Sequence, residues 1–251
     1  CGILREVHQK ERLTLQRVNC TSRGLADRNI AAARYQPFNA VCRLTCRILW
    51  DLLPKLMKIP DPMSEHKDAA RRQLRARREK LDLQGRAAHS AAIQSQLFKL
   101  PQLTSAAVVF CFISNGSEVS THAVIDRLQV MGKTVLVPKI LPGEPMRAVP
   151  FRGWDTLAPG VLGIPAPVDT VAYPGAVDLV LTPGLGFTPT GTRLGYGRGY
   201  YDCWFATHEH GLRVGVAFEC QLETTLPAEA SDVPVHVLIT EQRMIVMQAH
   251  R

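Results

Sequence analysis

The segment best suited to chemistry is GTRLGYGRGYYD, residues 191–202, which combines four glycines with two arginines and ends in an aspartate. Glycines at alternating positions allow positive φ angles and bring backbone N–H groups close to an anion. Arg193 and Arg198 supply planar guanidinium groups that match the geometry of phosphate oxygens. The segment therefore predicts a loop that binds a phosphorylated ligand, although glycine-rich loops also serve as plain turns.

The residues around this loop place it between a buried strand and a helix. VDLVLT, residues 177–182, is apolar enough for a buried strand, and YYDCWF, residues 200–205, begins a helix. Ligands of parallel sheets bind beyond the carboxyl ends of strands, and a helix N-terminus adds unpaired N–H donors. The GxGxG spacing matches neither the Walker A motif nor GxGxxG. Asp202 is open to two interpretations, an N-cap or first-turn carboxylate of the following helix, or a Mg²⁺ ligand.

Composition and charge exclude several classes of protein. The 251 residues are 46% hydrophobic and 21% charged, as in an ordinary globular protein. No apolar run approaches the roughly 20 residues of a membrane-spanning helix. Residues 1–62 carry 11 Lys and Arg against 5 Asp and Glu, whereas residues 63–251 carry 19 against 17. Because the positive excess lies mostly in the first segment, we expect no dedicated nucleic-acid surface in the remainder.

The seven cysteines are scattered and form no CxxC pair. An odd number of scattered cysteines is typical of a reducing, cytoplasmic compartment. Cys42 and Cys46 lie one helical turn apart, but two thiols alone make a poor zinc site.

The first 62 residues differ from the rest of the chain. Within them, FNAVCRLTCRILWDLLPKLMKI fits a basic amphipathic helix that is interrupted at Pro54. A targeting or membrane-surface segment is one interpretation. We favour the other, in which residues 1–62 are disordered or are translated upstream of a natural start at Met63. Because a coherent pattern begins at Met63, we expect one domain over residues 63–251.

Helical and strand patterns alternate from Met63 onward. Continuous apolar strands joined through helices are typical of a parallel sheet that is covered on both faces. We therefore predict an α/β protein with three layers, α/β/α, and a mostly parallel central sheet. Ser120 or Thr121 is the expected N-cap of the third helix, and Gly132 is its expected stop. The expected helices lie near 65–81, 86–100, 120–132 and 200–209, and the expected strands near 106–113, 134–140, 177–187, 213–218, 235–240 and 244–247, with a Pro/Gly-rich excursion at 141–175.

A longer stretch, PGLGFTPTGTRLGYGRGYYD, resembles the signature of the 5-formyltetrahydrofolate cyclo-ligase family, also called 5,10-methenyltetrahydrofolate synthetases. Segments similar to other family motifs follow in order: GSEVST, LVPKI, GIPAP, DLVLTPG, GVAFECQ and LPAEASDVPVHVLITE. The resemblance covers about residues 65–243 and none of 1–62. It implies a scaffold similar to that of sugar-phosphate isomerases and CoA transferases.

The resemblance also implies the site residues. It assigns ATP contacts to an early Lys-x-x-x-Arg element and to the glycine loop, with Arg193 and Arg198 in catalysis. It assigns folate contacts to the middle of that loop and to two earlier residues, and Mg²⁺ contacts to Asp202 and Asp232. The implied ATP-binding residues are Lys67, Asp68, Ala69, Ala70, Arg71, Arg193, Leu194, Gly195, Tyr196, Gly197, Arg198, Gly199, Tyr200 and Tyr201, and the implied folate-binding residues are Ile113, Glu118, Tyr196, Gly197, Arg198, Gly199 and Tyr200.

The sequence departs from the family pattern at a few positions. Ala70 stands where leucine is usual, which leaves Leu74-Arg75 as a competing register for the first element. Arg198 replaces a frequent lysine, and His236 replaces a frequent aspartate. Whether Lys139 contacts ligand or ends a strand stays open.

The reaction implied by the resemblance converts 5-formyltetrahydrofolate and ATP into 5,10-methenyltetrahydrofolate, ADP and phosphate, with Mg²⁺ as cofactor. The implied partners are these small molecules, without nucleic acid or membrane, and we expect a cytoplasmic monomer. One alternative is an ATP-independent sugar-phosphate isomerase or CoA-transferase-like enzyme on a similar scaffold. The others are a non-catalytic folate- or nucleotide-binding protein and an RNA-binding protein that acts through residues 1–62.

Overall fold

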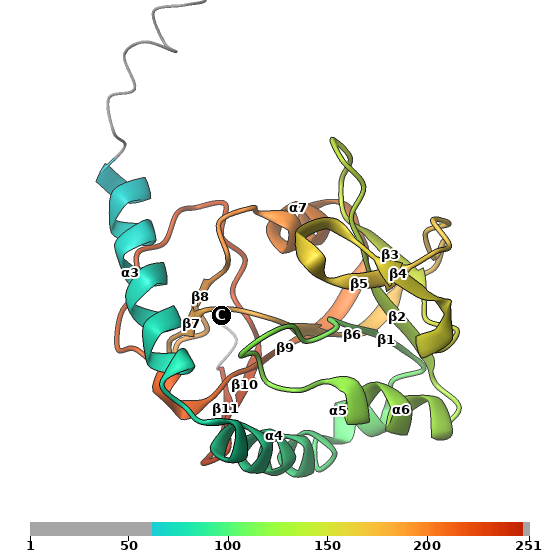
Figure 1. The fold of residues 1–251 in the computed structure, drawn as a ribbon, viewed down its shortest axis with the longest axis horizontal. Coiled ribbons are helices and arrows are strands. Elements are labelled where there is room, and N and C mark those ends of the chain that lie inside the picture. Colours follow the sequence, from blue (N-terminus) through green and yellow to red (C-terminus); the bar gives the residue numbers. More distant parts are fainter. Residues whose placement is uncertain (1–61, 248–251) are drawn as a thin grey trace, which may run out of the picture. The chain divides into compact units, whose positions relative to one another are not determined.

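A seven-stranded sheet forms the centre of residues 62–247, the part of the chain that the computed structural model describes (Figure 1). The strand order is β11-β10-β9-β6-β1-β2-β3. The five inner strands are parallel to one another, whereas β3 and β11 are antiparallel to their neighbours. The mostly parallel sheet is therefore confirmed. The strands are β1 Val108–Cys111, β2 Thr134–Lys139, β3 Arg147–Pro150, β6 Val177–Thr182, β9 His210–Val216, β10 Val237–Ile239 and β11 Met244–Val246.

Helices cover the two faces of this sheet unequally. Figure 1 shows α4, α5 and α6 together on one side of the sheet, with α7 and the small β4–β5 ladder on the other. The α3 helix lies beside the second small ladder, β7–β8. The bounds are α3 Pro62–Glu79, α4 Leu83–Leu97, α5 Pro101–Ser105, α6 His122–Val130, α7 Tyr200–Thr207, β4 Leu157–Pro159, β5 Pro165–Pro167, β7 Gly186–Phe187 and β8 Arg193–Leu194, with short 3₁₀ turns at Trp154–Thr156, Val161–Gly163 and Glu219–Gln221.

Alternation of side chains along β1 explains the layers. Val109 and Cys111 belong to the core cluster that contains Ile93, Leu103 and Leu128 from the α4–α6 layer. Phe110, between them, belongs to a separate cluster with Trp204 and other residues of the α7 side. Successive strand residues point to opposite faces, so one apolar run fills both cores.

The predicted elements mostly appear with shifted ends, and the excursion at 141–175 is more structured than predicted. It contains the edge strand β3 and the β4–β5 ladder. The short helix α5 is also absent from the prediction. The expected domain boundary falls at the beginning of α3, while expectations for residues 1–61 lie outside the described residues. Within 62–247 no helix is long and apolar enough to cross a bilayer.

Thr121 occupies the N-cap position of α6, but its side chain forms no cap hydrogen bond. Its φ of −107° and ψ of −4° are not the extended values that capping requires. The buried hydroxyl instead donates to the carbonyl oxygen of Phe112 at 2.7 Å and accepts from the backbone N–H of Ser114 at 3.0 Å. Thr121 is therefore the N-cap residue by position, as predicted, but its hydroxyl fixes the loop that follows β1 instead of capping α6.

Replacing Thr121 with valine keeps the shape of the side chain and removes both hydrogen bonds. The free energy of unfolding should fall by about 1–3 kcal/mol, because the buried carbonyl of Phe112 and the half-buried N–H of Ser114 lose the hydroxyl as a partner. Urea denaturation checks this, with Thr134→Val as the control on an exposed strand threonine. An equal loss in both variants would contradict the assignment.

Candidate active site

A cleft of about 1130 Å³ opens beyond the carboxyl ends of β1, β2 and β6. Most of its lining comes from α3, the loop after β1, the glycine loop with the start of α7, and residues 229–233. The remaining lining residues are Pro138, Ile140, Met146, Ile164 and Pro183. This is the edge of a parallel sheet where ligands bind. The predicted site residues that line it are Lys67, Arg71, Ile113, Glu118, Arg193, Leu194, Gly195, Tyr196, Gly197, Arg198, Gly199, Tyr200, Tyr201, Asp202 and Asp232.

The α3 helix presents one cationic face to the cleft. Lys67, Arg71, Arg75 and Arg78 all line it, and their spacing of four, four and three residues puts them on one side of a helix. Leu74 lies on the adjacent face and packs against Leu185 and Leu194. Both registers considered for the Lys-x-x-x-Arg element therefore contribute an arginine to the same cleft.

Three residues of the predicted 67–71 element do not line the cleft. Asp68 and Ala69 are exposed, and Ala70 packs against the cluster around Leu74. The carboxylate of Asp68 instead accepts from Nη1 of Arg71 at 2.6 Å. Helical geometry explains the split, because five consecutive positions cannot share one face.

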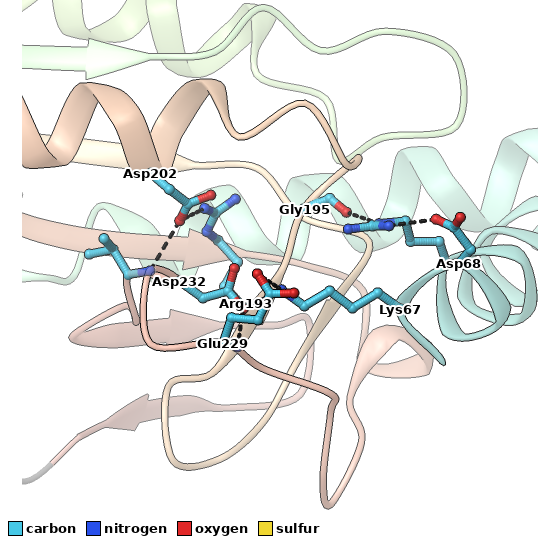
Figure 2. Close-up of polar contacts among 9 residues, drawn as sticks. Lys67, Asp68, Arg193, Gly195, Asp202, Glu229 and Asp232 are labelled. Atoms are coloured by element: carbon cyan, nitrogen blue, oxygen red, sulfur yellow. Dashed lines mark hydrogen bonds and ion pairs between the residues drawn. The ribbon is translucent and has the colours of Figure 1, made fainter. Parts of the chain in front are cut away.

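Lys67 is buried, and carboxylates surround its ammonium group. Figure 2 shows its side chain extending from α3 towards Asp232 and Glu229. Nζ lies 2.6 Å from Oδ2 of Asp232 and 3.4 Å from Oε2 of Glu229. Arg71, one turn further, donates from Nε to the carbonyl oxygen of Gly195 at 3.1 Å. The first helix is thus tied to both the 229–233 segment and the glycine loop.

Asp202 joins three segments at the start of α7. Its Oδ1 accepts from Nη2 of Arg193 at 2.6 Å and from the backbone N–H of Val233 at 3.0 Å, both drawn in Figure 2. Gly199 occupies the N-cap position of α7, so Asp202 does not cap its own helix. Arg193 is buried, and its Nε has no hydrogen-bond partner within the described residues.

The three alternating glycines of the loop do not share one conformation. Gly197 and Gly199 have φ of 92° and 65°, as predicted, but Gly195 does not have positive φ. Gly195 instead leaves room for the side chain of Arg193, because a Cβ at this position would lie 2.9 Å from Nη1 of Arg193. Arg198 at the loop tip is exposed and forms no hydrogen bond or ion pair with residues 62–247. It is therefore available to a ligand.

The two tyrosines after the loop are mainly core residues. Tyr201 stacks on Phe110 with ring centroids 5.9 Å apart, and Tyr200 packs against the same cluster. Burial raises the pKa of Tyr201 well above its ordinary value. Its hydroxyl is buried and has no hydrogen-bond partner among the described residues.

The loop after β1 supplies two of the predicted residues to the cleft. Ile113 is buried at the strand end, and Glu118 accepts from the backbone N–H of Asn115 at 2.8 Å. The other carboxylate oxygen of Glu118 accepts from the hydroxyl of Tyr196. The glycine loop and the loop after β1 are thereby joined across the cleft.

Lys139 and His236, one left open and one a departure from the family pattern, both lie outside the cleft. Lys139 does not line the cleft, and its Nζ donates to the carbonyl oxygen of Pro167 at 2.6 Å, which ties β2 to β5. His236 also lies outside the lining, with Nε2 2.8 Å from Nη2 of Arg213. Burial, followed by the charge of Arg213, lowers the pKa of His236.

The sequence interpretation missed several lining residues. Arg78 was detectable in principle, since it continues the helical spacing of the cations on α3. Ser117, Glu229 and Ile140 carry no pattern of their own, because only the folded loops bring them to the cleft.

The acidic residues permit one kind of metal site. Within residues 62–247, no group of three His, Cys, Asp or Glu side chains is arranged to hold a metal ion. Asp202 and Asp232 each use one carboxylate oxygen in protein contacts, and the second oxygen of each receives no hydrogen bond from the described residues. This donor set fits Mg²⁺ that keeps water and phosphate oxygens as its other ligands.

The fold and the cleft together define an α/β protein with a cleft rich in lysine and arginine at the carboxyl ends of parallel strands. A family model described as the 5-formyltetrahydrofolate cyclo-ligase family matches residues 63–241. The chain therefore belongs to this family of ligases, and the family implies ATP as co-substrate.

Individual relatives agree with this family. A probable 5-formyltetrahydrofolate cyclo-ligase of Caenorhabditis elegans is 30% identical over 150 residues, which are 54% of this chain and 73% of the relative. The 5-formyltetrahydrofolate cyclo-ligase of Escherichia coli K12 is 29% identical over 157 residues, 60% of this chain and 86% of the relative.

Solved structures also resemble this chain. The 5,10-methenyltetrahydrofolate synthetase of Aquifex aeolicus matches with a TM-score of 0.66 and 30% identity, over 74% of this chain and 94% of its own. A synthetase from Mycoplasma pneumoniae, at 20% identity and a TM-score of 0.55, covers 70% of this chain and 98% of its own, and shows the fold alone.

The ion pair of Lys67 makes stability depend on pH. Burial alone would raise the pKa of Asp232, but hydrogen bonds from Lys67 and from the backbone of Glu229, with the nearby charges, hold it below the ordinary 3.8. A lowered pKa stabilises the fold above the unfolded value, and this contribution disappears as the pH falls through the folded value.

Asp232→Asn should therefore lower the free energy of unfolding by on the order of 1 kcal/mol at neutral pH. The difference from the unsubstituted chain should shrink as the pH falls below about 3.8. Urea denaturation between neutral and acidic pH measures it, with the exposed Glu209→Gln as control. A difference that stays constant through this range would count against the ion pair.

Proposed function

We propose that this chain converts 5-formyltetrahydrofolate and ATP into 5,10-methenyltetrahydrofolate, ADP and phosphate. The observation that carries this proposal is a single cleft that contains both the cationic glycine loop and the apolar, carboxylate-bearing end around Ile113 and Glu118. One end suits phosphates and the other suits a ring system with polar N–H groups. Membership of the cyclo-ligase family supplies the substrate class.

The chemistry explains why phosphates must be bound. The formyl group on N5 is amide-like, and its oxygen is a poor leaving group. Transfer of the γ-phosphoryl group of ATP to that oxygen releases ADP and forms an imidate phosphate. Attack by N10 on the formyl carbon then forms the new C–N bond, and inorganic phosphate leaves with the former formyl oxygen. Positioning and charge neutralisation therefore supply most of the catalysis.

The residues of the glycine loop have distinct roles in this proposal. Arg198 contacts the transferred phosphoryl group, because it is the exposed cation at the loop tip without a protein partner in residues 62–247. Backbone N–H groups around Gly197 and Gly199, together with the N-terminus of α7, bind phosphate oxygens. Arg193 forms an ion pair with Asp202 and adds positive charge to the wall of the cleft.

Lys67 and Arg71 extend the positive charge along α3. Lys67 already faces two carboxylates, so we infer that it shares its charge between them and the phosphates. Asp202 and Asp232 would hold Mg²⁺ through their free carboxylate oxygens, and the ion would add to the neutralisation of phosphate charge.

The folate end of the cleft has an apolar wall and one carboxylate that can accept hydrogen bonds. Ile113, Ile140 and Met146 line an apolar wall suited to a flat ring. Glu118 provides carboxylate oxygens for the N–H groups of the ligand.

We also propose that the protein acts as a cytoplasmic monomer on small molecules, without nucleic acid or membrane as partners. Cys111, Cys203 and Cys220 are free thiols, as expected in a reducing compartment. The alternatives of an ATP-independent isomerase or transferase, or of a non-catalytic binding protein, leave the cationic loop without a phosphoryl group to transfer.

The full chain incubated with 5-formyltetrahydrofolate and Mg-ATP should produce the absorbance of methenyltetrahydrofolate and one ADP for each product. Omission of ATP should abolish both signals. Product formed without ATP, or no product at all, would refute the proposal.

Arg198→Ala should lower kcat/KM by about 10²–10³, as expected for loss of one transition-state contact. The free energy of unfolding should change by less than about 0.5 kcal/mol, because an exposed side chain without partners has little packing to lose. Turnover and urea denaturation measure the two effects. Arg198→Lys keeps the charge and should retain more activity, whereas a parallel loss of activity and stability would point to a structural role.

Asp202→Asn keeps the oxygen that accepts from Arg193 and Val233 and removes the charge. Half-maximal activity should then require roughly tenfold more Mg²⁺. A magnesium titration at fixed ATP tests this, with Glu209→Gln as control. An unchanged titration would leave Asp202 as a residue that only holds Arg193.

A further inference from the structure

Arg78 is a buried cation in the cleft to which the reaction above gives no role. It is only 5% exposed and lines the cleft from the last turn of α3. It forms no ion pair with any residue in the described range 62–247. Burying a charge without an ion-pair partner costs free energy. The hydrogen bonds of Arg78 must therefore stabilise its guanidinium group in this buried position.

Arg78 begins a chain of hydrogen bonds that runs through Tyr196 to Glu118, called the relay below, in which the donor of each bond is fixed. Nε donates to Oγ of Ser117 at 3.0 Å, and Nη1 donates to the hydroxyl oxygen of Tyr196 at 2.7 Å. The hydroxyl of Tyr196 in turn donates to Glu118. A guanidinium group has no acceptor and a carboxylate has no donor, so the tyrosine proton must point towards Glu118.

The surroundings of Tyr196 favour this arrangement. Desolvation of the hydroxyl, and then the carboxylate of Glu118, raises the pKa of Tyr196, whose hydroxyl therefore keeps its proton as a donor. The guanidinium carbon of Arg78 also lies 5.8 Å from the centre of the tyrosine ring. Gly197 beside it has φ of 92°, and a Cβ there would lie 3.2 Å from the guanidinium of Arg71. The loop thus approaches α3 closely enough for Tyr196 to reach across.

We propose that Arg78 is a positioning residue for the folate, acting through Tyr196 to orient the carboxylate of Glu118. Arg78 is eleven residues from Lys67, or about 16 Å along the helix axis. One face of α3 therefore serves both ends of the cleft, with Lys67 at the nucleotide end and Arg78 at the folate end. The identity of the ligand at this end rests on the proposed function, whereas the relay itself does not.

Steady-state kinetics of the full chain separate this role from a general structural one. Arg78→Met and Tyr196→Phe should each raise the KM for 5-formyltetrahydrofolate about tenfold and change the KM for ATP less than about twofold. The double variant should be no worse than either single variant, and Arg78→Lys should recover part of the loss. The matched control is Arg77→Met, which removes the neighbouring arginine that pairs with Glu223 outside the cleft.

An unchanged folate KM, or an equal rise in both KM values, would overturn the assignment. Tyr196→Phe removes only a hydroxyl from a side chain that is 37% exposed, so it decides the question even when Arg78→Met does not fold.

A stability cycle tests the relay independently of the reaction. Arg78→Met and Glu118→Gln should be non-additive by at least about threefold in the unfolding equilibrium constant, because Tyr196 connects them. In a Tyr196→Phe background the same two substitutions should become additive. A chain that forms no methenyl product refutes the proposed function, and additive effects in both backgrounds refute the relay.

Discussion

The cleft concentrates positive charge that the folded chain must tolerate before any ligand binds, and carboxylates from distant segments make this possible. Lys67 is compensated by Asp232, 165 residues later, and buried Arg193 is compensated by Asp202. Removing Asp202 would leave buried Arg193 without its ion-pair partner in residues 62–247, which costs more than the pair itself contributes, whereas Lys67 would keep Glu229 at 3.4 Å after loss of Asp232. The same contacts fasten α3, the glycine loop and the 229–233 segment to one another. Binding and folding therefore depend on the same charges.

The parallel sheet could be predicted because its strands carry a strong local signal. The run around Phe110 is apolar at every position, as required when both faces are covered. The edge strand β3 was missed because it lies in a segment rich in proline and glycine, whereas the other edge strand, β11, follows an apolar pattern and was predicted. Thr121 occupies the N-cap position that its residue type predicts, but the partners of its hydroxyl could not be predicted, because they are tertiary contacts with the loop after β1.

The candidate site was predictable where residue type and spacing coincide, as in the glycine loop and on α3. Lys67, Arg71 and Arg198 line one cleft, and all three lie in the stretches singled out from the sequence. The sequence could not show that Arg193 is committed to Asp202, or that Tyr196 reaches Glu118, because these contacts join loops by tertiary packing. Family resemblance supplied residue types for the site, and only the fold supplied their hydrogen-bond partners.

The base of the glycine loop has a consequence for how this chain can vary. The ring of Phe187 fills space that Gly184 and Gly215 leave open, since a Cβ on either glycine would lie 2.7 Å from that ring. The three positions therefore form one steric unit, and a larger residue at one of them requires a smaller one at another. Substitutions at these three positions must therefore compensate for one another in size. Arg198, exposed at the tip of the loop, is not subject to this restriction.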